Sequence, residues 1–129
     1  MEKIIIASGP VIVEDNKALL DISSGDDFWK FCGGKVKENE SLIMAAQRRA
    51  KEELGIDIEI INPEPFFMHV KKPGDENIDV VLVHWLAKRI GEPTPGQEVE
   101  KFDWLDVNAL PENIGPTVKP ALRHFGFIK

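Results

Sequence analysis

Apolar residues in the first quarter of the chain come in short runs that polar turns separate. Runs of this length between Gly, Pro and Asn residues are typical of β-strands. The segments Ser8-Gly9-Pro10 and Glu14-Asp15-Asn16-Lys17 divide the first three runs, and Cys32-Gly33-Gly34 predicts a tight glycine turn after the fourth. The strands expected from these runs span residues 4–6, 11–13, 18–22 and 28–31.

Residues 41–54 follow a helical pattern instead. They contain no Gly or Pro, Ile43 is their single β-branched residue, and Gly55 lies where a helix often ends in a left-handed residue. Helical periodicity separates one apolar stripe from one mixed face, whose alanine leaves room for a ligand to approach two carboxylates. The stripe consists of Ile43, Ala46, Ala50 and Leu54, and the mixed face consists of Ala45, Arg49, Glu52 and Glu53.

Four more strands and a closing helix are expected after this helix. The second and third of these strands predict a hairpin across residues 71–77, and Pro120 is expected to interrupt the closing helix early. Strands on both sides of a central helix predict one α/β domain over residues 1–129, a mixed sheet with helices packed on it. The expected elements are strands 56–60, 65–70, 78–87 and 99–105 and a helix over 118–125.

Composition restricts the possible partners. The 129 residues are 43% hydrophobic and 29% charged, and no apolar run reaches the roughly 20 residues that span a bilayer. A net charge of -6 argues against a non-specific binder of nucleic-acid polymers, which needs clustered Lys and Arg. An anionic substrate would therefore require a few placed cations or a bound metal. The single cysteine, Cys32, excludes an internal disulfide, and the chain starts without a signal-peptide pattern, so we expect a cytoplasmic protein with no membrane partner.

Several residues around the glycine turn and the helix form one set with defined spacings. Five residues separate the first two members of this set, and seven separate the second from the third. The set consists of Gly34, Glu40, Arg48, Glu52, Glu53, Gly55 and Ile56. It resembles the Nudix box, the signature of hydrolases that cleave nucleoside diphosphates linked to another group. The resemblance implies the Nudix α/β/α sandwich, in which a mixed sheet lies between helices.

The box residues also suit the chemistry. Pyrophosphate hydrolysis must neutralise several anionic oxygens and position a water, which hard divalent ions such as Mg²⁺ or Mn²⁺ do through oxygen ligands. Glu52 and Glu53 can share such an ion with a backbone carbonyl of Gly34. Arg48, four residues before Glu52, can orient that carboxylate. The resemblance further implies a glutamate in the loop before the last strand as metal ligand or base, and Glu98 matches that position best.

Simpler structural roles remain open for several of these residues. Glu52 and Glu53 have the alternative of a solvent-facing helix end, and Glu98 that of a solvated loop carboxylate. Glu40 is expected to bind substrate or only to help start the helix. Lys35 is expected to meet substrate phosphates or only to keep the surface solvated. The three histidines and the cysteine are assigned to packing, because their spacing matches no metal site and no nucleophile pair.

One box position departs from the family pattern. The glutamate that follows the arginine in the family is Arg49 here, three and four residues before Glu52 and Glu53 and within reach of both. Its guanidinium can supply charge that a second metal would otherwise bring. Two outcomes stay open. The enzyme works with fewer metals and another base, or the protein is a catalytically impaired module that binds a nucleotide or a protein.

The sequence therefore predicts a Nudix-type pyrophosphohydrolase that uses Mg²⁺ or Mn²⁺ on a small phosphorylated substrate, a nucleotide or nucleotide-like molecule. A homodimer is a further expectation, because many relatives pair. The predicted catalytic residues are Glu52, Glu53, Arg48 and Glu98, the metal ligands are Gly34, Glu52, Glu53 and Glu98, and the substrate-binding residues are Lys35 and Glu40.

Overall fold

The computed structural model describes residues 3–72 and 74–129 of the chain. Eight strands and two helices lie within these ranges. The strands are β1 (Lys3–Val11), β2 (Val13–Glu14), β3 (Lys17–Ser23), β4 (Gly34–Lys35), β5 (Asp57–Ile60), β6 (Phe66–Lys72), β7 (Asp75–Ile90) and β8 (Val99–Asp106). The helices are α1 (Leu42–Leu54) and α2 (Val118–His124).

The long strand β7 organises the main sheet. It has 16 residues and pairs in parallel with β1 along one edge. Its other edge is long enough to pair with two antiparallel strands. β6 pairs with its first half and β5 with its end, so the predicted hairpin of β6 and β7 is confirmed. β4 adds to the free edge of β1. The sheet is therefore mixed, and a second, antiparallel sheet has the order β2-β3-β8.

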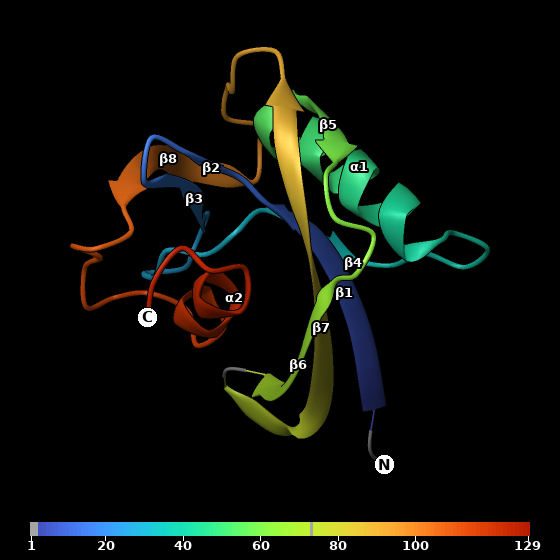
Figure 1. The fold of residues 1–129 in the computed structure, drawn as a ribbon. Coiled ribbons are helices and arrows are strands. Elements are labelled where there is room, and N and C mark those ends of the chain that lie inside the picture. The colour runs from blue at the N-terminus through green and yellow to red at the C-terminus, as the bar shows by residue number, and fades with distance from the viewer. Residues whose placement is uncertain (1–2, 73) are drawn as a thin grey trace.

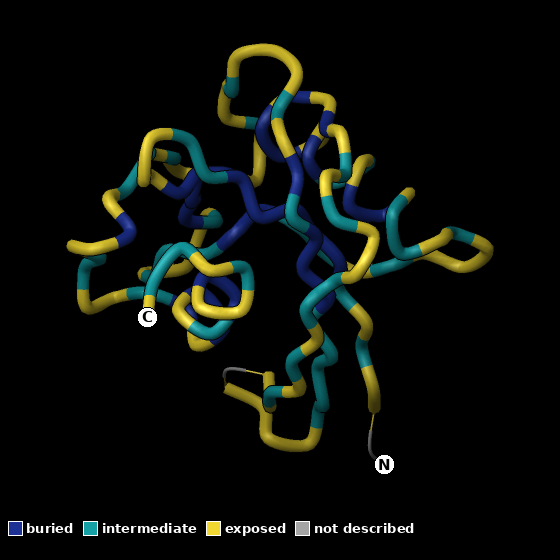
Figure 2. The backbone as a smooth tube through the Cα atoms, in the orientation of Figure 1, coloured by how far each residue is buried: buried dark blue, intermediate teal, exposed yellow. Residues whose placement is uncertain are grey.

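The two helices lie on opposite sides of the β1–β7 pair (Figure 1). Successive side chains of a strand face opposite ways. Val83, Trp85 and Ala87 accordingly pack in the cluster that holds the buried residues of α1, whereas Leu86 packs in the cluster that holds those of α2. Buried backbone is concentrated where helices and strands meet, and the turn end of β6 and β7 is more exposed (Figure 2). The predicted α/β/α sandwich is confirmed.

Both ends of α1 follow from its sequence. The Ser41 hydroxyl accepts a hydrogen bond from the Met44 amide at 3.1 Å, which satisfies one of the first free N–H groups. Gly55 ends the helix in the left-handed conformation with φ of 66°, and its N–H donates to the Lys51 carbonyl. These ends confirm the helix expected over 41–54.

Two predictions about the first 31 residues are wrong. Ser8-Gly9-Pro10 forms no turn, because β1 runs through it and pairs residue by residue with β7. A Cβ on Gly9 would overlap the Cys32 carbonyl oxygen, so the glycine permits a close backbone approach. The tract 28–31 is not a strand. It makes only isolated bridges, and Phe31 and Trp29 both pack in the cluster that includes α2.

Pro120 also behaves differently from the prediction, because α2 continues through it. The proline lies in the first turn after Thr117, where its missing N–H would have no helical partner in any case. Residue 73, in the turn predicted at 71–77, lies outside the described residues. Neither helix of the described chain has the length and apolar character required to cross a membrane.

Candidate active site

The glycine turn meets the end of α1 at Gly33. This residue has φ of 150°, and a Cβ on it would lie 2.8 Å from the Ser8 carbonyl oxygen, so only glycine fits. Its N–H donates to Glu53 Oε1 at 2.8 Å. The glycine turn, β1 and the helix are thereby joined at one point, directly beside the carboxylates of the box.

A first cluster, called here the inner pairs, consists of Asp21, Lys30 and Glu53. Lys30 Nζ lies 2.7 Å from Asp21 Oδ1 and 3.5 Å from Glu53 Oε2, and the two acids are 0% and 2% exposed. Burial raises the pKa of both carboxyls against the opposing effect of Lys30. Burial alone would lower the pKa of Lys30, but the carboxylates outweigh it and raise that pKa. The inner pairs form a desolvated ion network.

A second cluster, the outer pairs, consists of Glu40, Arg48 and Glu52. Arg48 donates to both Glu40 oxygens at 2.7 and 3.0 Å and to Glu52 Oε1 at 2.6 Å. The predicted contact of Arg48 with Glu52 is thus present. Hydrogen bonds from Arg48 and from the Lys37 amide lower the pKa of Glu40 to about 2. The Arg48 hydrogen bond likewise lowers the pKa of Glu52.

Arg49 joins these two clusters. Its nitrogens lie 3.2 Å from Glu52 Oε2, 3.3 Å from Glu53 Oε1 and 3.3 Å from Glu98 Oε2. Its Nε also donates to the Gly33 carbonyl oxygen at 3.4 Å. Four oxygen atoms from the glycine turn, the helix and the loop before β8 therefore surround one guanidinium.

A charged cavity of about 580 Å³ opens beside this guanidinium. Four cations and three acids border it, and the cations can bind a ligand with several anionic oxygens. Arg48 and Arg49 are only 22% and 18% exposed, and their ion pairs with acids fix the positions of the two guanidinium groups. The lining residues are Lys35, Val36, Lys37, Glu38, Arg48, Arg49, Glu52 and Glu98.

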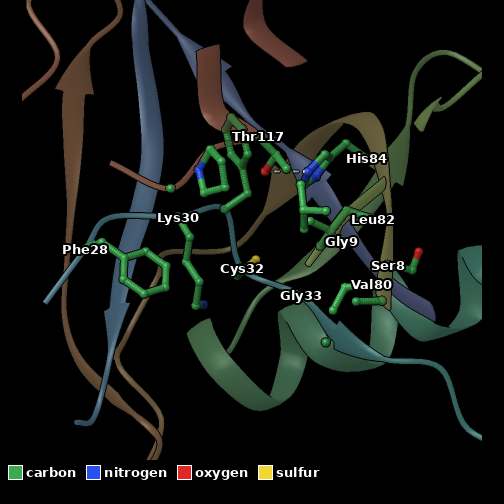
Figure 3. Close-up of a pocket in the computed structure, with 16 residues that line it drawn as sticks. Ser8, Gly9, Phe28, Lys30, Cys32, Gly33, Val80, Leu82, His84 and Thr117 are labelled. Carbon is green, nitrogen blue, oxygen red and sulfur yellow. Dashed lines mark hydrogen bonds between the residues drawn. The ribbon is translucent and has the colours of Figure 1, made fainter. Parts of the chain in front are cut away.

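A second cavity, apolar and of about 190 Å³, is lined by Gly33 of the glycine turn (Figure 3). Val80 and Leu82 of β7 form part of its wall, with Phe28 and Lys30 at one side and the His84–Thr117 pair at another (Figure 3). His84 Nε2 lies 3.1 Å from Thr117 Oγ1. Burial lowers the pKa of His84 to about 4, so this imidazole is neutral near pH 7.

The structure brings the predicted residues to one place but gives them different exposure. Glu52 is 44% exposed and Glu98 is 74% exposed. Glu53 is 2% exposed, so the expectation of open access to both helix carboxylates is wrong. The mixed face of α1 turns partly inward, because Ala45 is fully buried with Glu53.

Other predicted residues act through neighbours. The Lys35 carbonyl accepts from Arg48 at 2.9 Å, and Lys35 itself lines the charged cavity. The sequence predicts the Gly34 carbonyl as a metal ligand, whereas the carbonyl that accepts from Arg49 is that of Gly33. Glu40 holds Arg48 and the Lys37 amide beside the start of α1. The metal and substrate roles of these residues stay predictions.

Sequence reasoning missed Asp21 and the far wall of the apolar cavity. An aspartate inside the apolar run 18–22 was a readable signal, because a charge in a buried strand requires a partner. Thr117 carried no such signal, since only the fold brings it to His84, 33 residues away along the chain. Cys32 is buried as expected, and burial raises the pKa of its thiol well above the usual value.

Comparison with known families agrees with this geometry. A profile of the NUDIX domain matches residues 6–125, so the chain belongs to the Nudix family of pyrophosphohydrolases. Members of this family cleave nucleoside diphosphates linked to another group, act on small phosphorylated substrates and generally use divalent metal ions.

Individual relatives are similar to different extents. A solved MutT NUDIX hydrolase from Burkholderia pseudomallei superimposes with a TM-score of 0.82 at 25% identity, covering 95% of this chain and 98% of that one. The m7GpppN-mRNA hydrolase of Saccharomyces cerevisiae is 27% identical over 112 residues, which are 84% of this chain but 11% of that protein. The 8-oxo-dGTP diphosphatase of Buchnera aphidicola is 53% identical over 32 residues, 25% of each chain.

A resident divalent ion does not fit the site as it is arranged. The donor chemistry is suitable, since carboxylates and carbonyls are the ligands of Mg²⁺. However, Lys30, Arg48 and Arg49 already pair with the carboxylates of Glu52 and Glu53. Among the residues that the structure describes, no group of three or more His, Cys, Asp or Glu is arranged to hold a metal.

Proposed function

We propose that the protein hydrolyses the pyrophosphate linkage of a nucleotide or nucleotide-like substrate. One observation carries the proposal: the two cavities meet at consecutive residues, because the glycine turn lines the apolar cavity and the residue directly after the turn lines the charged one. Gly33 and Gly34 line the apolar cavity, and Lys35 lines the charged one. A diphosphate in the charged cavity would therefore place an attached apolar or aromatic group within reach of the other.

The side chains around the charged cavity divide the work. Arg48 is held at the edge of the cavity by Glu40 and Glu52, where its positive charge would attract phosphate oxygens. In the proposed reaction, water attacks a phosphorus atom while the bridging P–O bond breaks. Glu98, the most exposed acid at the Arg49 guanidinium, would accept the proton that the water loses. Glu53 would fix the turn and Arg49 from beneath.

Mg²⁺ or Mn²⁺ is proposed as the divalent ion of this hydrolase, in keeping with the general habit of the family. Because cations of the chain already hold the carboxylates, we propose that the ion arrives on the diphosphate oxygens of the substrate. The free protein would then have low affinity for the ion, and substrate would raise it.

A substrate panel tests the proposal. Purified protein is incubated with nucleoside triphosphates, dinucleotides, nucleotide sugars and ADP-ribose in Mg²⁺ or Mn²⁺, and products are separated by chromatography. We expect cleavage of at least one member into two phosphorylated products. For that substrate, Arg48→Ala and Glu98→Gln should each lower kcat by about 10²-fold, the usual effect of losing a preorganised charge or a general base.

Lys51→Ala is the matched control for this panel, because Lys51 lies on the same helix, is 62% exposed and pairs only with Asp57 in the described structure. Its kcat should equal that of the wild type. Failure of the wild type to cleave any member with either metal would refute the proposed hydrolase.

A binding module without turnover is the second candidate, and Arg49 is the observation that favours it. The residue replaces an acid of the family pattern and lies at the centre of the carboxylates. Arg49→Glu separates the two functions. Large activity gained from an inactive protein would identify the natural chain as a binding module, whereas unchanged or reduced turnover in an active protein would confirm that the hydrolase accommodates Arg49.

A second copy of the chain is proposed as a partner on the strength of the family resemblance alone. Ile4, Ile6 and Phe67 leave 68%, 44% and 58% of their surface exposed. Sedimentation equilibrium would decide between a 14.5 kDa monomer and a species of twice that mass.

A further inference from the structure

We infer that Arg49 is a built-in replacement for a bound divalent cation, so that the free protein holds its acidic site together with a guanidinium and binds no metal ion there. This inference deepens the proposed function and rests on it for the identity of the site. It concerns the resting protein, before any substrate has bound.

The contacts of Arg49 are those of a coordinating centre. Its three side-chain nitrogens approach four oxygens that belong to Gly33, Glu52, Glu53 and Glu98, at distances of 3.2 to 3.4 Å. These are ion-pair and long hydrogen-bond distances between nitrogen and oxygen, whereas a Mg²⁺ ion requires oxygens at about 2.0–2.1 Å. The four oxygens are thus arranged around the planar guanidinium of Arg49 and not around a single ion.

The backbone makes room for this guanidinium. A Cβ on Gly34 would overlap the Nε atom of Arg49, so the absence of a side chain at residue 34 lets the arginine lie against the turn. Gly34 does not have a positive φ, and its conformation therefore does not require glycine. In this chain a side chain at residue 34 would therefore have to displace Arg49.

Charge balance supports the same conclusion. Glu53 is 2% exposed and has both oxygens engaged, one by Arg49 and the Gly33 amide, the other by Lys30. Both oxygens of Glu52 face Arg48 and Arg49. A divalent ion added to this set would meet three cations and no unpaired helix carboxylate. Metal binding would have to displace Arg49, at the cost of its four contacts.

The test measures Mn²⁺ binding to the whole protein without any nucleotide, by calorimetry and by the electron paramagnetic resonance of free Mn²⁺. We expect no measurable binding to the wild type in the submillimolar range. Arg49→Glu exchanges the guanidinium for a fourth carboxylate ligand, and its dissociation constant for Mn²⁺ should be at least about tenfold lower, because ligand charge and number set the affinity of oxygen sites.

Lys51→Glu is the matched control, since it makes the same change of charge on an exposed face of the same helix. It should bind Mn²⁺ as weakly as the wild type. Mn²⁺ should also raise the melting temperature of Arg49→Glu and leave that of the other two proteins unchanged. If Arg49→Glu does not fold, Arg49→Gln provides the same comparison by removing the cation without adding an acid.

Three results would overturn the inference: Mn²⁺ binding to the wild type within threefold of Arg49→Glu, equal gain of binding in Lys51→Glu, or no binding to the folded Arg49 variants. None of these measurements uses turnover. A negative substrate panel together with the expected Mn²⁺ pattern would therefore reject the proposed hydrolase and leave the inference standing.

Discussion

Glu52 and Glu53 are neighbours in the chain and yet lie in opposite electrostatic environments. Glu53 is 2% exposed, and burial raises its pKa, whereas Glu52 is 44% exposed, and Arg48 lowers its pKa. Successive helical residues are separated by about 100°, which is enough to place one carboxylate under the glycine turn and the other at the cavity. Adjacent acids of a single motif therefore serve different purposes.

The inner and outer pairs extend this contrast. In the inner pairs one lysine contacts two buried acids, and removal of the lysine leaves both acids without their shared cation in a desolvated place. In the outer pairs Arg48 is held by acids at the rim of the charged cavity, and solvent screens Glu52, which is 44% exposed. The inner pairs should contribute to stability, and the outer pairs to ligand binding.

Lys30→Met should produce the largest loss of stability. It leaves Asp21 and Glu53 without their shared cation, and we expect the free energy of unfolding to fall by about 3 kcal/mol, the lower end for a broken buried pair because Lys30 is 25% exposed. Urea denaturation measures the change. Lys51→Met is the control and should cost less than about 0.5 kcal/mol. Adding Asp21→Asn to Lys30→Met should recover part of the loss, and additive effects of the two changes would contradict the pairing.

The neighbouring glutamates give the next largest difference. Glu53→Gln should cost about 2 kcal/mol, because the amide replaces one accepting oxygen by an N–H donor that faces Lys30 or Arg49. Glu52→Gln should cost under about 1 kcal/mol at its exposed site. Both changes keep the side-chain shape, so urea denaturation compares the effects of the two environments, buried at Glu53 and exposed at Glu52, on the free energy of unfolding. Equal losses in the two variants would remove the distinction between inner and outer pairs.

The sequence was sufficient for those parts of this picture that depend on local periodicity. The ends of α1 were predictable because Ser41 and Gly55 are strong helix signals, and the reach of Arg48 to Glu52 follows from helical geometry. The layers of the fold came from the resemblance of the box. Gly9 and Pro10 were misleading, because pairing with β7 keeps this part of β1 extended. Pro120 was misleading, because a proline in the first turn of α2 does not interrupt the helix.

Contacts between distant segments were not predictable in the same way. Asp21 and Lys30 meet because the tract after β3 bridges back to it, and no spacing rule anticipates a bridge outside a regular strand. The burial of Glu53 likewise depends on Gly33, which approaches from another element. The apolar cavity required the fold, since its walls come from β7 and from the loop before α2.

Gly34→Ala sharpens the role of Arg49 with a smaller effect. The added Cβ would press on Nε of Arg49, and the arginine must shift, at a cost of about 1 kcal/mol for overpacking. Gly115→Ala is the matched control, because its Cβ would meet only ordinary contacts at 3.5 Å or more. Thermal unfolding compares the two. A neutral Gly34→Ala with unchanged Mn²⁺ affinity would show that the turn does not hold Arg49 in place.

The smallest effect concerns the pH dependence of the outer pairs. The folded pKa of Glu40 is about 2, below the usual 4.5, so its charged form stabilises the fold above pH 4.5, and this contribution is lost as the pH falls toward 2. Asp21 and Glu53 have raised pKa values, so their contribution is present in acid and lost as the pH rises. The inner and outer pairs therefore change the stability of the fold in opposite directions as the pH falls.

Glu40→Gln removes the outer contribution to this balance. Between pH 4.5 and pH 2 its melting temperature should fall less steeply than that of the wild type, since one carboxylate no longer needs to be protonated on unfolding. Glu38→Gln changes an exposed acid of the same loop and should keep the wild-type slope. An unchanged slope in Glu40→Gln would mean that Arg48 does not depend on Glu40, and the outer pairs would then be held by Glu52 alone.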